Sequence, residues 1–150
     1  GEPQFEDTFR WAQSRWPGRV SAQITYSDNL SRRVYGAADL FLMPSRSEPC
    51  GLSQLIAMRY GAVPIVRQTG GLNDTVRSCQ VGQPDGNGYV FSACTAHDLC
   101  QTLGQAVGLY RGDRLGFDIV RRRGMTEDFG WGRSAGAYRR IYQDLSRRNH

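Results

Sequence analysis

The sequence predicts an α/β fold with a parallel, doubly wound sheet. Short apolar runs alternate with amphipathic helical segments, and the run at 40–43 is continuously apolar, which is typical of a parallel strand buried on both faces. In such sheets ligands bind at the carboxyl ends of the strands, so the loops after Met43 and Val66 are the candidate site. Only three or four strands can be counted, and we expect residues 1–150 to be part of a larger domain.

The first third of the chain is expected to form a helix, a strand and a second helix. Apolar residues at steps of three and four predict a helix at 2–16, which Pro17-Gly18 ends. Residues 20–26 are predicted to be a strand, and Asp28 is expected to cap the next helix. The positions expected to face inward are Phe5, Phe9, Ala12 and Trp16 in the first helix and Leu30, Val34 and Ala37 in the second.

The middle of the chain continues the alternation of helix and strand. We expect Gly51 to open a helix, residues 62–66 to form a buried strand, the turn-rich residues 82–88 to be an exposed loop, and residues 89–91 to add a short strand. Leu52, Leu55 and Ile56 are expected on the inward side of the helix that Gly51 opens.

The last third is expected to be helical. Thr95 and Asp98 resemble a capping box, and further helical stretches are predicted near 113–123 and at the C-terminal end. The expected inward positions are Leu99, Leu103, Ala106 and Tyr110 in the first of these helices and Tyr138, Ile141, Tyr142 and Leu145 in the last.

Composition excludes several classes of protein. The net charge is +5, and every basic residue is arginine. Because the arginines are scattered, solvated helix faces explain them better than a nucleic-acid site does. The positive field favours an anionic small ligand. No apolar run approaches the roughly 18 residues that cross a bilayer, so we expect no membrane partner and an intracellular location.

The spacing of the four cysteines does not match that of metal ligands, which predicts free thiols and no metal. These cysteines are Cys50, Cys79, Cys94 and Cys100.

The loop at 44–55 carries most of the functional information. A carboxylate at Glu48 comes just before a helix that begins near Gly51, and the free N–H groups of a helix N-terminus bind phosphate. Ser53 adds a hydroxyl donor, while Glu48 would face a neutral sugar because a diphosphate would repel it. These residues are also compatible with a solvated loop carboxylate and an ordinary helix start, and local spacing leaves both interpretations open.

The second candidate loop, residues 67–76, contains the pair Gly70-Gly71, which exposes backbone amides to a ligand. Arg46 and Arg67 could neutralise phosphate or form ordinary surface ion pairs. Cys50 is better explained as a small packing residue than as a nucleophile, since no histidine is near it in the sequence.

Residues 37–76, A-A-D-L-F-L-M-P-S-R-S-E-P-C-G-L-S-Q-L-I-A-M-R-Y-G-A-V-P-I-V-R-Q-T-G-G-L-N-D-T-V, resemble the glycogen and starch synthase signature. The resemblance continues in G-Y-V-F at 88–91 and in residues 122–135, which are similar to the family segment M-x-x-D-F-S-W-x-x-S-A. It covers nearly the whole chain. It implies that the chain is part of the C-terminal, Rossmann-like, nucleotide-sugar-binding domain of a GT-B enzyme whose N-terminal domain is absent here.

The resemblance also implies a reaction and a site. The reaction is retaining and metal-independent, needs no cofactor, and transfers glucose from ADP-glucose or UDP-glucose to the non-reducing end of an α-1,4-glucan. Glu48 would be the catalytic residue that contacts the donor glucose. The substrate-binding residues would be Cys50, Gly51, Leu52, Ser53, Thr69, Gly70 and Gly71. The similarity to bacterial and plastid enzymes favours ADP-glucose and a bacterial cytoplasmic or plastid stromal location.

The sequence departs from the wider family in two respects. Many two-domain retaining transferases have a second acid eight positions after the first, where this chain has Ile56, although synthases commonly lack that acid. The family's phosphate-binding Arg and Lys, and its Lys-Thr-Gly-Gly loop, fall outside these 150 residues, so we expect the chain alone to be inactive. The alternatives are a related transferase of the sucrose or trehalose type and a non-catalytic nucleotide-sugar-binding fragment.

Overall fold

The computed structural model describes residues 2–148 and divides the chain into two units, Gly1–Arg32 and Arg33–His150. The first unit contains α1 (Pro3–Arg15) and the beginning of α2 (Asp28–Ala37), which confirms both predicted helices. The predicted cap of α2 is wrong, because the Ser27 hydroxyl rather than Asp28 accepts a hydrogen bond, at 3.2 Å, from the backbone N–H of Leu30. Asp28 instead forms an ion pair with Arg32 at 2.9 Å.

The predicted strand at 20–26 is wrong. These residues are irregular, and none of them is paired in a sheet in the described part of the chain. A strand leaves its backbone N–H and C=O groups unsatisfied unless a neighbouring strand pairs with them. The sequence pattern therefore predicted a strand at a place where the described residues 2–148 provide no neighbouring strand to pair with it.

The sheet has three parallel strands in the order β1-β2-β3, comprising β1 (Leu40–Met43), β2 (Val63–Arg67) and β3 (Tyr89–Phe91). Leu40 pairs with Val63, and Ile65 pairs with Tyr89. These strands and their parallel order confirm the predicted fold class. The expectation that β1 is buried on both faces is wrong, because it is an edge strand of the sheet and Leu42 is 42% exposed. The central strand β2 is the one buried on both faces.

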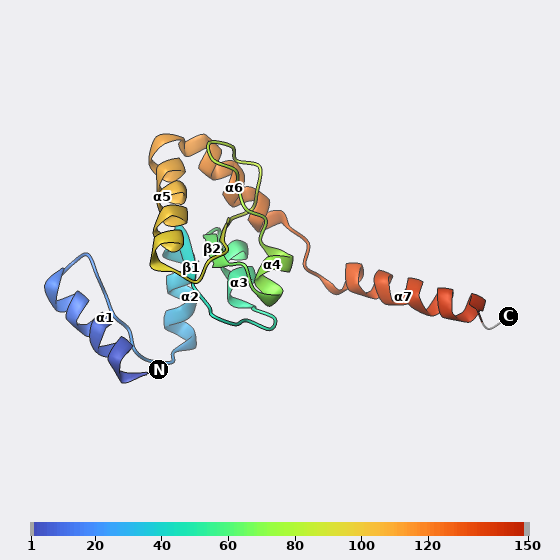
Figure 1. Ribbon diagram of the computed structural model, residues 1–150, viewed down its shortest axis with the longest axis horizontal. Helices are drawn as coiled ribbons and strands as arrows, with labels where there is room; N and C mark the ends of the chain where they lie inside the picture. The colour runs from blue at the N-terminus through green and yellow to red at the C-terminus, as the bar shows by residue number, and fades with distance from the viewer. Residues whose placement is uncertain (1, 149–150) are drawn as a thin grey trace. The chain divides into compact units, whose positions relative to one another are not determined.

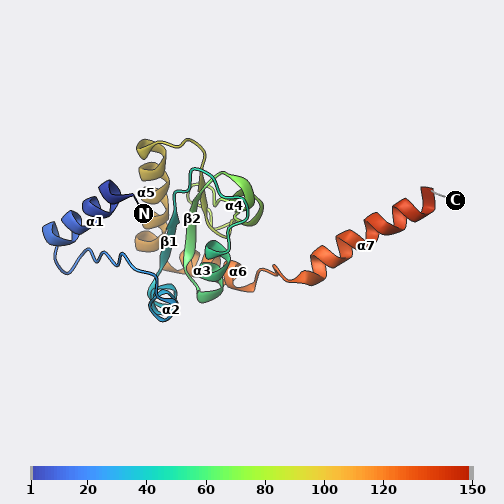
Figure 2. The same cartoon turned by 90° about the horizontal axis from the view of Figure 1, so that it is seen from below.

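Helices cover both faces of the sheet: α5 (Ala96–Gly112) lies on one side, and α3 (Ser53–Tyr60) and α4 (Gly70–Thr75) lie on the other (Figure 1 and Figure 2). Alternate residues of β2 point to opposite faces. Ile65 packs in one core cluster with Ala106 of α5 and Phe117 of α6 (Arg114–Thr126), whereas Val66 packs in a second cluster with Met58 of α3 and Leu72 of α4.

The predicted inward face of α5 is confirmed, and its N-terminus is capped as expected. The Thr95 hydroxyl accepts a hydrogen bond of 3.2 Å from the backbone N–H of Asp98. The Asp98 carboxylate accepts hydrogen bonds from the backbone N–H groups of Ser92 and Ala93, which ties the turn after β3 to the helix. Ala106 is buried, and Leu99, Leu103 and Tyr110 pack against the first cluster.

The buried face of α3 was predicted correctly only in part. Leu55 packs against the second core cluster, as predicted. Leu52 is 69% exposed and Ile56 is 42% exposed, while Gln54, Ala57 and Met58 are buried. Met58 packs with Val66 of β2, and Ile56 lies on a different side of the helix, where it is partly exposed. The expectation of an exposed loop at 82–88 is also only partly right, because residues 86–88 are buried.

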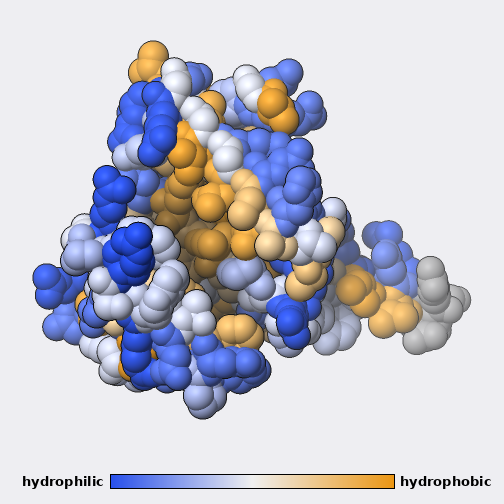
Figure 3. Space-filling model, turned by 60° about the vertical axis from the view of Figure 1, so that its left-hand side comes forward, coloured by the Kyte–Doolittle hydropathy of each residue, from blue (hydrophilic) through white to orange (hydrophobic). Residues whose placement is uncertain are grey.

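Many apolar positions in the outer helices are exposed, and apolar residues lie among hydrophilic ones on the surface drawn in Figure 3. These positions were predicted to face inward, and their amphipathic spacing marks faces that residues 2–148 leave uncovered. The exposed set comprises Phe5, Phe9 and Trp16, Val34 and Ala37 of α2, and Tyr138, Ile141, Tyr142 and Leu145 of α7 (Trp131–Arg148). All four cysteines are free thiols, as predicted, with only Cys79 buried. Within the described residues, none of the helices combines the length and apolar character that crossing a bilayer requires.

Candidate functional site

The loops that follow β1 and β2 meet, as expected for the carboxyl ends of neighbouring parallel strands. The backbone N–H of Gly71 donates a 3.3 Å hydrogen bond to the carbonyl of Glu48. A Cβ at Gly70 would collide with that same carbonyl, and a Cβ at Gly71 would collide with the carbonyl of Cys50. The two glycines are therefore required for the close approach of the backbones, and the approach places residues 48–53 beside residues 69–71.

The N-terminus of α3 opens onto this junction. Leu52 is the N-cap residue, and its side chain makes no capping hydrogen bond to the first turn. Gly51 precedes it with a φ of 70°, a left-handed conformation that favours glycine. The first-turn N–H groups thus lack the N-cap side-chain acceptor that usually satisfies one of them. Because the positive end of the helix dipole is at this point, the arrangement suits an anion.

The buried side-chain amide of Gln54 connects the two loops through hydrogen bonds. Gln54 is fully buried, and its Nε2 donates hydrogen bonds to the carbonyl of Gly51 at 2.9 Å and to the hydroxyl of Thr75 at 3.1 Å. The Thr75 hydroxyl in turn donates to the carbonyl of Gly71 at 2.7 Å. Sequence reasoning missed this network, because a glutamine on an amphipathic helix is ordinarily assigned to the solvent side.

Arg67 also has a structural role that the sequence did not indicate. Its Nε donates a 2.8 Å hydrogen bond to the carbonyl of Ser45, and Nη2 donates to the carbonyl of Arg46. The guanidinium thereby fixes the first part of the loop after β1. Neither a phosphate contact nor an ordinary surface ion pair, the two roles considered from the sequence, describes these contacts. Arg46 itself is exposed at the junction.

The predicted site residues are brought together, with different exposure. Glu48, Ser53, Thr69 and Gly71 are half-buried, and Gly51 is buried. The exposed members of the set are Cys50, Leu52 and Gly70. Residues 48–53 and 69–71 thus lie together beyond the carboxyl ends of β1 and β2.

The segment that resembles the family's second motif lies against the same helix. Asp128, Phe129 and Gly130 line a cavity of about 360 Å³ together with Leu55, Ile56 and Arg59 of α3. Arg59 donates a 2.8 Å hydrogen bond from Nη1 to the carbonyl of Met125, which fastens the end of α6 to α3. The position of the missing second acid, Ile56, thus faces this neighbouring cavity.

Comparison with known proteins assigns the family. The family described as "Glycosyl transferases group 1" matches residues 11–107. The chain belongs to this family. The match includes both loops of the site.

Two curated relatives of this chain are glycogen synthases. The protein from Bacillus cereus (strain ATCC 10987 / NRS 248) is 44% identical over 145 residues, and the one from Bacillus subtilis (strain 168) is 46% identical over 147 residues. The alignments cover 97% and 98% of this chain but 30% of each relative. The chain thus spans about 30% of the length of these relatives.

Solved structures agree with the fold. The catalytic domain of starch synthase IV from Arabidopsis thaliana, bound to ADP and acarbose, superposes with a TM-score of 0.78 at 34% identity, covering 95% of this chain and 30% of that one. Sucrose-phosphate synthase from Thermosynechococcus elongatus gives a TM-score of 0.64 at 23% identity, over 97% of this chain and 35% of that one. The second likeness shows the fold alone.

The chain should depend on Gly71 for its stability as well as for its site. We expect Gly71→Ala to lower the free energy of unfolding by about 1–3 kcal/mol, because the new Cβ forces the two loops apart. Gly104→Ala in α5 is the matched control, since its Cβ would meet nothing within 4 Å, and it should stabilise by about 0.5–1 kcal/mol. Urea unfolding measures both. Equal stabilities of Gly71→Ala and the parent would contradict the close approach.

Proposed function

We propose that this chain supplies the donor-binding part of a retaining α-glucan synthase, which transfers glucose from ADP-glucose to the non-reducing end of an α-1,4-glucan. The observation that carries the proposal is the junction of the two loops at the uncapped N-terminus of α3, with Glu48 beside it. A diphosphate would accept hydrogen bonds from the first-turn N–H groups and from Ser53, where the helix dipole favours negative charge.

In this arrangement Glu48 would contact the glucose rather than the phosphates. A carboxylate close to a diphosphate is repelled, whereas sugar hydroxyls donate hydrogen bonds to it. The Gly70-Gly71 backbone would approach the same ligand, since neither residue carries a side chain. The rest of the charge on the leaving diphosphate would be neutralised by basic groups in the remainder of the enzyme. The glycogen synthase relatives and the ADP-bound starch synthase IV support this choice of donor and reaction.

Within the proposed enzyme, residues 1–150 would be part of the C-terminal domain of a two-domain GT-B architecture. The acceptor would be held by the opposing domain, so that the glucan end meets the donor glucose across a cleft. We favour this over a sucrose- or trehalose-forming transferase because those relatives usually keep the second acid that Ile56 replaces.

ADP binding tests the proposal in the full-length protein that carries this chain. We expect Gly51→Val to weaken ADP binding at least about tenfold, because the new side chain would collide with the Gln54 amide and displace the N-terminus of α3. Ser53→Ala should weaken binding less, by about the value of one hydrogen bond. Gly18→Val is the control for the backbone strain alone, because a Cβ at Gly18 meets nothing, whereas a Cβ at Gly51 meets Gln54. Gly18 has a φ of 75° against 70° for Gly51, so the backbone strain is similar, but it lies far from the site in sequence and has open space around it.

Isothermal titration calorimetry with ADP measures all four proteins. The Gly18→Val control should bind ADP like the parent. Among the other proteins, affinity for ADP should fall in the order parent, Ser53→Ala, Gly51→Val. Equal affinities for the parent, Gly51→Val and Ser53→Ala would show that the diphosphate binds elsewhere.

A further inference from the structure

Two buried side-chain amides, those of Gln54 and Asn87, hold Thr75 behind the two loops of the candidate site. Both residues are fully buried. The hydroxyl of Thr75 accepts a 3.1 Å hydrogen bond from Nε2 of Gln54, and the carbonyl of Thr75 accepts one of 3.1 Å from Nδ2 of Asn87. Thr75 is the last residue of α4, which begins with Gly70 and Gly71 of the second loop. The two amides therefore act on the helix that carries this loop.

The partners of Gln54 determine which way its amide faces. The carbonyl of Gly51, 2.9 Å from Nε2, can only accept a hydrogen bond, so it requires the nitrogen. The single hydroxyl proton of Thr75 is donated to the carbonyl of Gly71 at 2.7 Å, so the Thr75 oxygen must also accept from the nitrogen. Both N–H groups of Gln54 are thus used. Its Oε1 is buried and has no hydrogen-bond partner among the described residues.

The two amides differ in what they contribute to stability. Oδ1 of Asn87 accepts a 2.7 Å hydrogen bond from the backbone N–H of Arg77, and Nδ2 donates to Thr75, so both ends of that amide are paired. The unpartnered oxygen of Gln54 has lost its water without gaining a donor, which destabilises the folded state. An apolar side chain at position 54 would avoid this loss. Stability alone therefore does not explain the glutamine.

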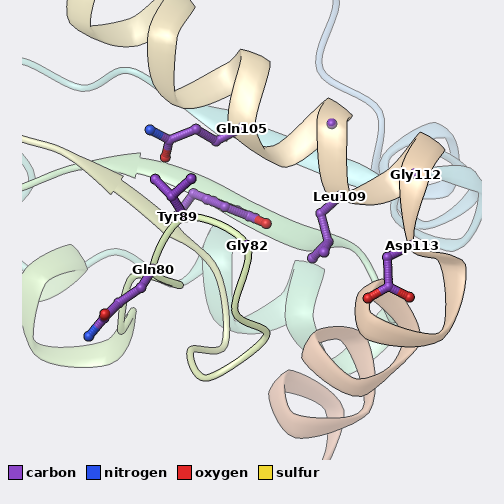
Figure 4. A pocket seen from close by; sticks show the side chains of 9 residues that line it. Gln80, Gly82, Tyr89, Gln105, Leu109, Gly112 and Asp113 are labelled. Carbon is purple, nitrogen blue, oxygen red and sulfur yellow. The ribbon is translucent and has the colours of Figure 1, made fainter.

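The cavity drawn in Figure 4 does not supply the missing donor. It lies between α5 and the start of β3, has a volume of about 360 Å³, and is lined by residues that include Tyr89 and Leu109. Neither Gln54 nor Thr75 lines it. The unpartnered oxygen instead lies against Gly51, since a Cβ on that glycine would be 2.7 Å from Oε1. The amide is thus in contact with the candidate site and separate from this cavity.

The Gln54 amide fixes one backbone carbonyl in each loop. It holds Gly51 directly and Gly71 through the Thr75 hydroxyl. Gly51 immediately precedes the first turn of α3, whose N–H groups are proposed to bind the diphosphate, and Gly71 belongs to the backbone proposed to approach the same ligand. A shift of either loop would change the spacing between these groups. Small displacements of this kind weaken a site that is built for one geometry.

We propose that Gln54 is a positioning residue for the donor diphosphate, which keeps the two loops at the spacing that the ligand requires and lowers the stability of the fold in doing so. Gln54 acts through Gly51 and Thr75, because it is itself fully buried. This rests on the proposed function, since it assumes a diphosphate at the N-terminus of α3.

Gln54→Met in the full-length protein separates positioning from stability. Methionine is unbranched and favours a helix, but it removes both donated hydrogen bonds together with the unpartnered oxygen. We expect the dissociation constant for ADP to rise at least about fivefold, whereas the melting temperature should stay within about 3 °C of that of the parent. Isothermal titration calorimetry and thermal unfolding measure the two quantities.

Thr75→Val and Thr75→Ser form a matched pair that tests the hydroxyl. Valine has the shape of threonine without the hydroxyl, so Thr75→Val should raise the dissociation constant for ADP by about two- to tenfold, the value of one hydrogen bond. Serine keeps the hydroxyl, so Thr75→Ser should recover the affinity that Thr75→Val loses. Val120→Ala is the control for lost stability. Val120 is buried in α6, within the first core cluster, so this variant should melt at a lower temperature but bind ADP like the parent.

The proposal is overturned if Gln54→Met binds ADP with the affinity of the parent, or if Val120→Ala loses as much affinity as Gln54→Met does. A parent protein that binds no ADP would instead contradict the proposed function. In that case hydrogen exchange on the ligand-free proteins still tests Gln54. The backbone amides of residues 69–75 should exchange at least about threefold faster in Gln54→Met than in the parent, which would establish that Gln54 positions the loop, and equal rates would overturn the proposal.

Discussion

Glu48→Ala in the full-length protein is expected to lower turnover at least about 100-fold, which is the usual cost of removing one positioning or charge-stabilising group. The proposed role of the side chain is to hold the donor glucose during transfer. The fold makes little use of it: the hydrogen bond that joins the two loops is accepted by the backbone carbonyl of Glu48, and alanine keeps that carbonyl. The expected pattern is thus a large loss of kcat with a nearly unchanged melting temperature.

Asp144→Ala is the control for removing an exposed carboxylate away from the site, since Asp144 lies in α7. It should retain the turnover of the parent. Initial rates with labelled ADP-glucose and a glucan primer, together with thermal unfolding, decide the matter. Near-parental turnover by purified Glu48→Ala, or a loss fully explained by unfolding, would contradict the assigned role.

The position of the candidate site could be predicted because it depends on topology. Alternating strands and helices predict a parallel sheet, and the carboxyl ends of parallel strands lie at one edge, so the loops after β1 and β2 were expected to lie near each other. The contact between Glu48 and Gly71 confirms that expectation. The roles of the individual residues stay predictions, because geometry alone does not identify a ligand.

What could not be predicted depends on partners that periodicity does not specify. The orientation of α3 follows from which face meets the sheet, and the sequence Leu-Ser-Gln-Leu-Ile offers apolar residues on more than one side. Gln54 occupies the buried position, and its side-chain N–H groups donate hydrogen bonds to the carbonyl of Gly51 and the hydroxyl of Thr75. Arg67 was similarly unpredictable, since its acceptors are backbone carbonyls of another loop.

The 150-residue chain alone is expected to show no measurable primer elongation, although Glu48 and the α3 N-terminus are both present in it. Transfer requires the donor glucose and the glucan end to be held together in a cleft that excludes water. The chain spans about 30% of the length of its glycogen synthase relatives, and the proposed acceptor surface would lie outside that share. Losing a few kcal/mol of charge stabilisation on the diphosphate alone lowers the rate by about two to three powers of ten.

Binding and catalysis should therefore separate in this chain. Weak ADP binding is expected to persist, because the amides that we propose to receive the diphosphate belong to the N-terminus of α3, and it should be lost in Gly51→Val. Purified chain and full-length protein are incubated in parallel with labelled ADP-glucose and a glucan primer, and ADP binding is titrated on both. Elongation by the chain alone would overturn the two-domain argument, since it would show that one side of the cleft suffices to hold donor and acceptor in reacting geometry.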